Sequence, residues 1–426
     1  VHAEMGLVTQ IFREPDFYPL VGERAIGHTR YSTTGSSLLC NAQPLVVEGY
    51  QGRVALANNG NIINCSQLQG QLQKDWNCTF ESSTDTEVVA YMLANAAGAD
   101  WEERLFYCMR QLEGAYSLVA LTEDTLMAAR DPLGIRPLCI GKLDGGWIIA
   151  SESCALDHLG ATYMRELEPG EVVIIDSDGF HSSVWSGATG RRSLCVFELI
   201  YFARPDSLMD NQLVHSVRQE LGAQLAREHP VEADLVIGIP DSSTAAAVGY
   251  ARESGIPFSE GLVKNRYVGR TFIEPEQRMR DLGVRQKFNP LTEVIAGQRI
   301  VVVDDSIVRG TTTPHVVGLL RKAGAKEIHM RVCAPPIMHP CFMGVDMASR
   351  QELIAANQTV EEIRQFIDAD SLGYLAVKGL LKVVGGSDGG FCDACFTGNY
   401  PVPVQLELTK LVLEEPSKAE LEILSD

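Results

Sequence analysis

The sequence predicts two successive folds, a layered α+β domain followed by an α/β domain with a parallel sheet. The first half contains many short segments that are apolar or alternate in polarity and stop at Gly, Asn or Asp, which is typical of strands joined by turns. The second half contains an apolar strand, a polar loop, a helix and a second strand in direct succession over residues 300–336. This alternation is typical of parallel sheets covered by helices.

Length and charge limit the possible functions. The chain has 426 residues, which is enough for two or three domains with their own cores. A formal net charge of −19 opposes binding to nucleic acid or to an anionic membrane. No apolar run approaches the roughly 20 residues that a membrane span requires. We therefore expect neither nucleic acid nor a membrane as a partner.

The cysteine content and the first residues of the chain indicate the cellular compartment of the protein. Eleven cysteines in a chain of this pattern indicate a reducing compartment rather than a secreted disulfide scaffold. We expect the residues from Val1 onward to form a strand and a turn in a domain that has already begun. No signal or transit peptide is visible. We expect a cytoplasmic protein, with a plastid left open because the N-terminal segment is missing.

Local patterns place the main elements. In the first half, strands are predicted at 53–60, 116–121, 146–151 and 170–176, and helices at 85–97 and 101–112. In the second half, helices are predicted at 215–229 and after Asp241, strands at 233–240 and 329–336, a mobile loop from Lys264, and a helix in the acidic tail.

The second half is organised around residues 300–313, which read IVVVDDSIVRGTTT. The apolar run is typical of a strand buried on both faces, and Asp304 and Asp305 follow where it should end. Open α/β sheets bind ligands at this edge. The residues from Gly310 to Thr313 precede a helix and could hold a phosphate at its positive end. The alternative is an ordinary turn whose acids cap the helix.

Four clusters in the first half and one in the second carry a resemblance. The clusters GHTRYSTTG, ANNGNI, STDTEVV and RDPLGIRPL occupy residues 27–35, 57–62, 83–89 and 130–138. In this order they resemble the glutamine amidotransferase domain of the N-terminal-nucleophile class, which has αββα layers. The 300–313 stretch resembles the phosphoribosyl pyrophosphate motif of type I phosphoribosyltransferases.

The whole chain resembles the glutamine phosphoribosylpyrophosphate amidotransferases. The resemblance implies three parts, a glutaminase domain at 1–190 without its N-terminal segment, a phosphoribosyltransferase domain at 191–375 and a C-terminal tail at 376–426. It implies transfer of ammonia from glutamine to phosphoribosyl pyrophosphate, which gives phosphoribosylamine, pyrophosphate and glutamate in the first step of purine biosynthesis. It also implies a homotetramer that purine nucleotides inhibit.

The resemblance assigns residues to the phosphoribosyl pyrophosphate site. Magnesium, which prefers oxygen ligands, would be held by Asp304, Asp305 and Ser242. Phosphoribosyl pyrophosphate would be bound by Asp304, Asp305, Arg309, Gly310, Thr311, Thr312, Thr313 and Arg270. Lys264 and Arg266 would act on the pyrophosphate as the mobile loop closes. The alternative for these loop cations is solvated surface charge.

A second set belongs to the glutamine site. The Asn59 side chain and the Gly60 N–H match the family's oxyanion hole. Glutamine would be held by Arg30, Thr33 and Asp85. The family's N-terminal cysteine nucleophile is not in the sequence, so either its segment was left out or the glutaminase is inactive; we favour omission because the other glutamine-site residues are present.

The cysteines divide into two groups. Cys392 and Cys395 form a CxxC pair, which alone could be a zinc or redox pair. Together with Cys195 and Cys341 they match the ligand positions of the iron–sulfur-containing subgroup. The resemblance favours a [4Fe–4S] cluster over an all-cysteine zinc site. We expect the other seven cysteines to be small buried residues.

Two other functions stay open. One is a phosphoribosyltransferase that uses ammonia only or salvages a nucleobase and carries an inactive glutaminase domain; the absence of an obvious base-recognition segment weakens the salvage form. The other is a non-catalytic regulator that senses nucleotides on the same fold. A glucosamine-forming amidotransferase would share the first half but not the 300–313 stretch.

Overall fold

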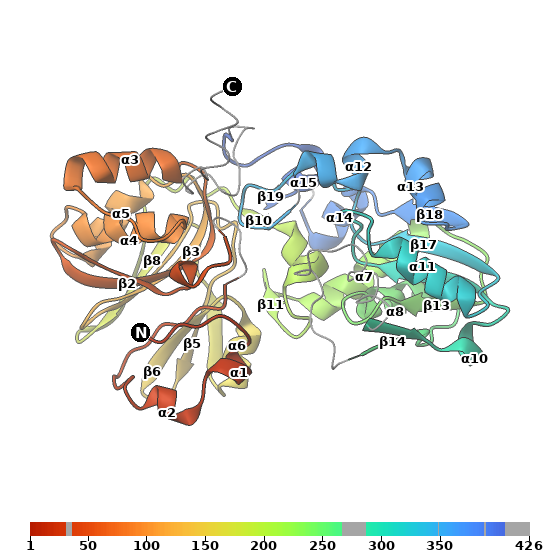
Figure 1. Ribbon diagram of the computed structural model, residues 1–426, viewed down its shortest axis with the longest axis horizontal. Coiled ribbons are helices and arrows are strands. Elements are labelled where there is room, and N and C mark those ends of the chain that lie inside the picture. Colours follow the sequence, from red (N-terminus) through yellow and green to blue (C-terminus); the bar gives the residue numbers. More distant parts are fainter. Residues whose placement is uncertain (31–35, 266–286, 348, 387–388, 405–426) are drawn as a thin grey trace, which may run out of the picture.

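The computed structural model describes residues 1–30, 36–265, 287–347, 349–386 and 389–404. They form two lobes that lie side by side (Figure 1), one from each half of the chain. Between the lobes, β10 (Ser193–Cys195) pairs in parallel with β19 (Gly390–Cys392).

The first lobe contains two antiparallel sheets. The larger sheet has the order β1-β2-β3-β4-β8-β9 and the smaller sheet the order β6-β5-β7. The strands are β1 (Leu45–Gly49), β2 (Gly52–Ile62), β3 (Gly114–Leu121), β4 (Leu126–Arg130), β5 (Cys139–Leu143), β6 (Gly146–Ala150), β7 (Thr162–Glu166), β8 (Glu171–Asp176) and β9 (Gly179–Val184). The helices are α3 (Cys65–Trp76), α4 (Asp85–Asn95), α5 (Trp101–Met109) and α6 (Ser153–His158).

Alternating side chains build the layers of this lobe. On β8, Val172 and Ile174 belong to the core beneath α3, α4 and α5, whereas Val173 and Ile175 pack toward the smaller sheet. This is the period of two expected of a strand. On the outer side of the smaller sheet, Leu156 of α6 packs against its strands. The result is a helix–sheet–sheet–helix stack, which confirms the αββα expectation.

The second lobe contains a parallel sheet of order β13-β16-β17-β18. Its strands are β13 (Leu235–Gly238), β16 (Arg299–Asp304), β17 (Glu327–Val332) and β18 (Ser371–Tyr374). Helices α7 (Val214–Glu228) and α8 (Thr244–Ser254) cover one face, and α11 (Thr313–Lys322) and α13 (Val360–Phe366) cover the other. On β16, Val301 and Val303 face the first pair and Ile300 and Val302 the second. The predicted parallel sheet is therefore confirmed.

The remaining elements are short. They are α1 (Val8–Ile11), α2 (Glu14–Phe17), η1 (Leu39–Asn41), η2 (Glu198–Phe202), β11 (Leu208–Met209), β12 (Gln212–Leu213), β14 (Leu262–Lys264), β15 (Phe288–Pro290), α10 (Thr292–Ile295), η3 (Arg350–Glu352), α12 (Ile354–Asn357), α14 (Val377–Val384) and α15 (Ala394–Thr397).

The structure differs from the local predictions at the start of the chain and at α3. The strand expected from Val1 is wrong, because no described residue before Leu45 is in a strand and large apolar side chains such as Val21 stay exposed. Helix α3 was not predicted. The tail helix and most of the loop after Lys264 lie outside the described residues. No described helix is long and apolar enough to span a membrane.

Candidate active sites

Two aspartates meet two serines at the carboxyl edge of the parallel sheet. Asp304 ends β16, and the loop after the neighbouring strand β13 carries Ser242 and Ser243. The Ser242 hydroxyl donates to Asp305 Oδ2 at 2.5 Å. The Ser243 hydroxyl donates to Asp304 Oδ1 at 3.3 Å. The topology thus brings two predicted metal-binding segments together where open α/β sheets bind ligands.

The electrostatics of the pair call for a cation. Burial raises the pKa of Asp304 well above its usual range, and the adjacent carboxylate of Asp305 raises it further. Burial also raises the pKa of Asp305, although hydroxyls from Ser242 and Ser306 oppose this shift. Two crowded carboxylates are unfavourable when both are ionised. A positive partner would relieve that repulsion.

Lys287 is a cation near this pair that sequence reasoning missed. Its ammonium favours the ionised form of Asp304 and so lowers the pKa of that carboxyl. Lys287 lies just before β15, which pairs with β14. A lysine in a cation-rich stretch carries no signal of its own, and only the pairing of these two strands brings it back to the sheet edge.

The loop before α11 has the shape of a phosphate cradle. Gly310 has a φ of +71°, a conformation that favours glycine, and a Cβ there would lie 2.6 Å from Ile354 Cδ1, which would have to shift. The N–H groups of residues 310–313 donate no hydrogen bond within the described part of the chain. With Thr312 as its N-cap, α11 directs its positive end at this loop.

Of the cations predicted to contact phosphoribosyl pyrophosphate, the structure describes two, and they lie in different surroundings. Lys264 Nζ lies 2.5 Å from Asp241 Oδ2, in the same loop as Ser242. Arg309 instead forms an ion pair with Glu352 at 3.4 Å on the surface. Arg266 and Arg270 lie outside the described residues.

The glutamine-site residues come together in the first lobe. Asn59 and Gly60 lie on β2, and Asp85 is the first residue of α4. The Ile62 N–H donates to Asp85 Oδ2 at 2.9 Å, and Asn58 Nδ2 approaches the same oxygen at 3.5 Å. The end of β2 therefore fixes the carboxylate directly.

Charge complementarity links Asp85 to Arg30. Burial raises the pKa of Asp85 to about 6, while its backbone and Thr86 hydrogen bonds and the Arg30 charge oppose the shift. Burial lowers the pKa of Arg30, and Asp85 opposes that shift. A cation and an anion at one site can hold the two charged groups of an amino acid. Thr33 lies outside the described residues.

A buried ion pair that sequence reasoning missed lies behind Asn59. Arg136 Nη2 is 2.9 Å from Glu198 Oε1 and 3.5 Å from Asn59 Oδ1. Arg136 is 7% exposed and Glu198 3%. Arg136 belongs to the RDPLGIRPL cluster, but its partner comes from the start of the second lobe.

The four predicted ligand cysteines line one small cavity between the lobes. Cys195, Cys341, Cys392 and Cys395 form its walls together with apolar side chains such as Phe197 and Met343. Cys195 and Cys392 are register partners on β10 and β19. The Met343 N–H donates to Cys341 Sγ at 3.3 Å. All eleven cysteines are free thiols.

The thiols that line this cavity are protonated unless a metal binds them. Burial raises the pKa of Cys392 to about 12, so the thiols need a metal to become thiolates. Among the described residues, no group of three or more His, Cys, Asp or Glu is arranged to hold a single metal ion. Of the other seven cysteines, Cys40 is exposed and Cys78 and Cys154 are half-buried, contrary to expectation.

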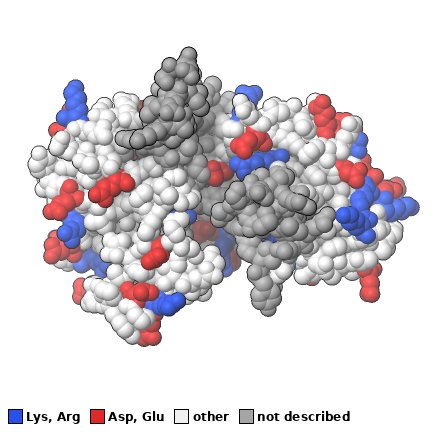
Figure 2. Space-filling model, viewed as in Figure 1, with Lys and Arg blue, Asp and Glu red and all other residues white. Residues whose placement is uncertain are grey.

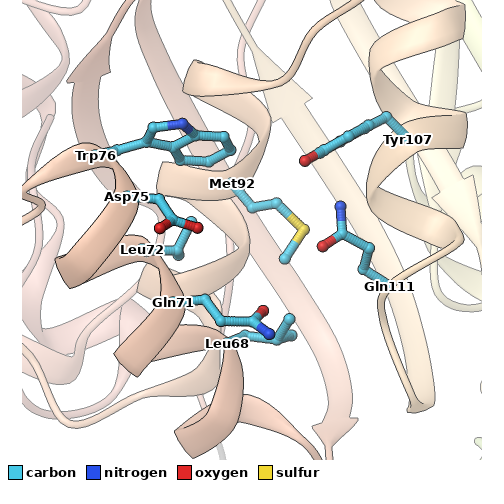
Figure 3. A pocket seen from close by; sticks show the side chains of 8 residues that line it. All are labelled: Leu68, Gln71, Leu72, Asp75, Trp76, Met92, Tyr107 and Gln111. Atoms are coloured by element: carbon cyan, nitrogen blue, oxygen red, sulfur yellow. The ribbon is translucent and has the colours of Figure 1, made fainter.

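A separate cavity lies among the helices of the first lobe. It measures about 50 Å³ and opens between α3, α4 and α5, where Trp76, Met92, Tyr107 and Gln111 point into it (Figure 3). Pockets for small-molecule ligands are usually several times larger. None of the predicted site residues lines it, so we do not place the chemistry there.

Charges are mixed on the surface. Figure 2 shows acidic and basic side chains interspersed over both lobes on the face in view.

Comparison with known proteins identifies the family. Residues 28–158 match the family model of the glutamine amidotransferase domain, and residues 206–336 match that of the phosphoribosyl transferase domain. The amidophosphoribosyltransferase of Synechocystis sp. is 50% identical over 420 residues, which cover 97% of this chain and 85% of that protein. This chain belongs to the amidophosphoribosyltransferase family.

Solved structures agree with this assignment. The glutamine phosphoribosylpyrophosphate amidotransferase from B. subtilis, complexed with ADP and GMP, has a TM-score of 0.83 at 46% identity, covering 91% of this chain and 85% of that one. A structure described as the allosteric regulatory enzyme of purine biosynthesis has a TM-score of 0.87 at 44% identity, covering 97% and 90%.

The family gives the activity. An amidophosphoribosyltransferase transfers ammonia from glutamine to phosphoribosyl pyrophosphate, and this is the first step of purine biosynthesis. The chain is such an enzyme, a pentosyltransferase, and the comparisons favour this activity over the ammonia-only or salvage alternative.

Proposed function

We propose that each lobe of this amidophosphoribosyltransferase catalyses one of two successive reactions. Glutamine is hydrolysed in the first lobe, and the ammonia reacts with phosphoribosyl pyrophosphate in the second. The observation that carries the proposal is the junction of Asp304 and Asp305 with Ser242, beside the loop of Gly310 at the start of α11.

In the first lobe, Arg30 pairs with the glutamine carboxylate and Asp85 with its ammonium group, while Thr33 lines the site. The nucleophile is the N-terminal cysteine that the family resemblance implies, and it is not among the residues of this sequence. Its thiolate adds to the amide carbon, the C–N bond breaks, ammonia leaves, and water then releases glutamate. The Asn59 side chain and the Gly60 N–H stabilise the oxyanion.

In the second lobe, the nitrogen of ammonia forms a bond to the anomeric carbon as the bond to pyrophosphate breaks. Asp304, Asp305 and Ser242 would hold Mg²⁺, which would supply positive charge to the leaving pyrophosphate. The two carboxylates fit such an ion because their own repulsion is relieved by it. The aspartates also accept hydrogen bonds from the ribose hydroxyls.

The anionic ends of the substrate bind to different loops. The 5′-phosphate accepts hydrogen bonds from the unpaired N–H groups and the hydroxyls of Gly310, Thr311, Thr312 and Thr313. Lys264, Arg266 and Arg270 bind pyrophosphate. Arg309 also contacts the substrate, for which its surface ion pair with Glu352 opens.

We infer that the four-cysteine cavity holds an iron–sulfur cluster. Cys195, Cys341, Cys392 and Cys395 would hold a [4Fe–4S] cluster, which would join the tail to the segments that carry Cys195 and Cys341. The family resemblance, with four cysteines and no obligatory histidine, favours such a cluster over an all-cysteine zinc site. Backbone N–H groups that donate to cysteine sulfur, as Met343 does, also tune such clusters.

Regulation, assembly and location complete the proposal. Purine nucleotides act as inhibitors, in keeping with the ADP and GMP bound to the B. subtilis relative. The enzyme is a cytoplasmic homotetramer with the domain limits 1–190, 191–375 and 376–426. Light scattering at several concentrations, with and without GMP, tests the assembly.

The decisive test is release of pyrophosphate from phosphoribosyl pyrophosphate, measured with ammonia and separately with glutamine. We expect activity with ammonia, and activity with glutamine only when the protein carries an N-terminal cysteine. A folded protein that contains the cluster but releases no pyrophosphate with either nitrogen source would overturn the proposal.

A further inference from the structure

The segment after Cys341 is fastened to the strand that carries the oxyanion hole. Asn61 Nδ2 on β2 donates to the carbonyl oxygen of Phe342 at 3.0 Å. Gly344 has a φ of +94°, and a Cβ at this position would lie 2.8 Å from both Cα and the carbonyl carbon of Gly60. The two backbones therefore touch, and no larger residue than glycine fits between them.

The segment after Cys195 reaches the same strand by another route. Glu198 follows Cys195 by three residues, and its carboxylate pairs with Arg136 at 2.9 Å. Arg136 Nη2 then approaches Asn59 Oδ1 at 3.5 Å. Because both charged side chains are almost fully buried, this pair cannot rearrange without leaving an unpaired charge inside the protein.

The two routes start from one cavity and converge on three consecutive residues, Asn59, Gly60 and Asn61. Near the cavity, the segments are also held to the tail: the Tyr400 hydroxyl donates to the Pro340 carbonyl oxygen at 2.7 Å. The Tyr400 and Phe342 rings lie 5.3 Å apart. The back of the oxyanion strand thus rests on residues whose own positions depend on the cysteines.

We propose that the four-cysteine site positions the oxyanion strand, and that Gly344 and Arg136 are the positioning residues through which it acts. The proposal rests on the glutamine site and the cluster proposed above. A hydrogen bond from Arg136 to Asn59 Oδ1 turns the Asn59 amide N–H group the other way, toward the substrate. Filling the cysteine site and binding glutamine are then linked equilibria, and each strengthens the other by the same factor.

Reciprocity gives a test that needs no turnover. In the protein containing its cluster, the loss of visible absorption at roughly 400 nm is followed after addition of an iron chelator, with and without saturating glutamine. We expect glutamine to slow this loss about tenfold, a usual size for linked sites. Calorimetry gives the glutamine affinity of the protein with and without its cluster, and we expect the cluster to strengthen glutamine binding about tenfold.

Matched glycine variants test the route. Gly344→Ala should abolish the glutamine effect and weaken glutamine binding about tenfold. Gly324→Ala is the control, because Gly324 has nearly the same φ, +92°, but its Cβ would approach Ala296 only to 3.4 Å. If Gly344→Ala does not fold, Asn61→Ala removes the side chain that donates to Phe342 and should reduce the effect.

The outcomes separate this inference from the proposed function. A wild-type protein that contains the cluster and binds glutamine, yet loses the cluster at one rate with and without glutamine, overturns the coupling and leaves the proposed function intact. A glutamine effect that survives in both Gly344→Ala and Asn61→Ala overturns the route. A protein that takes up no cluster or binds no glutamine overturns the proposed sites and the coupling with them.

Discussion

Lys264 Nζ lies 2.5 Å from Asp241 Oδ2, so the ammonium proposed to bind pyrophosphate is already paired with a carboxylate from the loop of Ser242. This aspartate is 77% exposed and the lysine 34%. Exposed ion pairs contribute little to stability, and the pair can therefore open at small cost. Substrate would take the place of Asp241 as the partner of the ammonium.

Lys264→Ala should reduce kcat/KM for phosphoribosyl pyrophosphate by about 10- to 100-fold in the ammonia-dependent reaction, since a charge-assisted hydrogen bond contributes about 1.5–3 kcal/mol. The measurement is initial rates of pyrophosphate release. Lys322→Ala, an exposed lysine at the end of α11, is the control and should behave as wild type. An unchanged kinetic profile for Lys264→Ala would remove it from the site.

Asp305→Asn should greatly reduce activity but preserve stability. The raised pKa values of both aspartates mean that their ionised forms oppose folding above those pKa values. At pH 7.5 without Mg²⁺, the free energy of unfolding in urea should be equal or higher in the variant. Activity should fall by roughly 100-fold or more, as for loss of a main electrostatic group. A destabilised variant would show that the pair is structural.

Glutamine affinity should depend on the ionisation of Asp85. Because the pKa of Asp85 is raised to about 6, calorimetry should show constant affinity above pH 7 and a loss approaching tenfold per pH unit below about 6. The native pKa exceeds the unfolded one, so this group lowers the free energy of unfolding as the pH rises from about 4 to 6. Asp85→Asn should bind glutamine weakly at every pH; pH-independent binding by wild type would exclude this role.

Gly310→Ala should lower the free energy of unfolding by more than the cost of holding alanine in the left-handed conformation. Residues other than glycine pay about 1–2 kcal/mol for that conformation, and at Gly310 the new Cβ also meets Ile354 Cδ1. Gly385→Ala, at φ +80° with no atom within 4 Å, measures the conformational part. We expect urea denaturation to give a larger loss for Gly310→Ala, and its affinity for phosphoribosyl pyrophosphate to fall; equal losses would show that Ile354 simply moves aside.

Elements that carry their pattern locally could be predicted from the sequence. The strand, loop and helix from Ile300 to Lys322 combine an apolar run, two acids and a glycine–threonine loop, and each part determines its own conformation. Helix α3 could not be found in this way, because Leu68 and Leu72 are isolated among glutamines and only the sheet beneath them makes their burial favourable.

The candidate sites divide in the same way. Asp85 and Asp304 stand in recognisable clusters. Arg136, Glu198 and Lys287 have no local signal, because their roles depend on partners from distant segments. The side chain of Arg309 was predicted to contact substrate, but Glu352 competes for it on the surface. Local sequence patterns do not reveal contacts between segments that lie far apart in the chain.

The parallel pairing of β10 with β19 also sets an order of events during synthesis. The first lobe can fold while the rest of the chain is still being translated. The four-thiol cavity cannot close until Cys395 has left the ribosome, since its walls come from the segments after Cys195 and Cys341 and from the tail. A nascent chain interrupted before this point has an oxyanion strand without its rear support. A chain that ends before Cys395 therefore lacks one of the four cysteines proposed to hold the cluster.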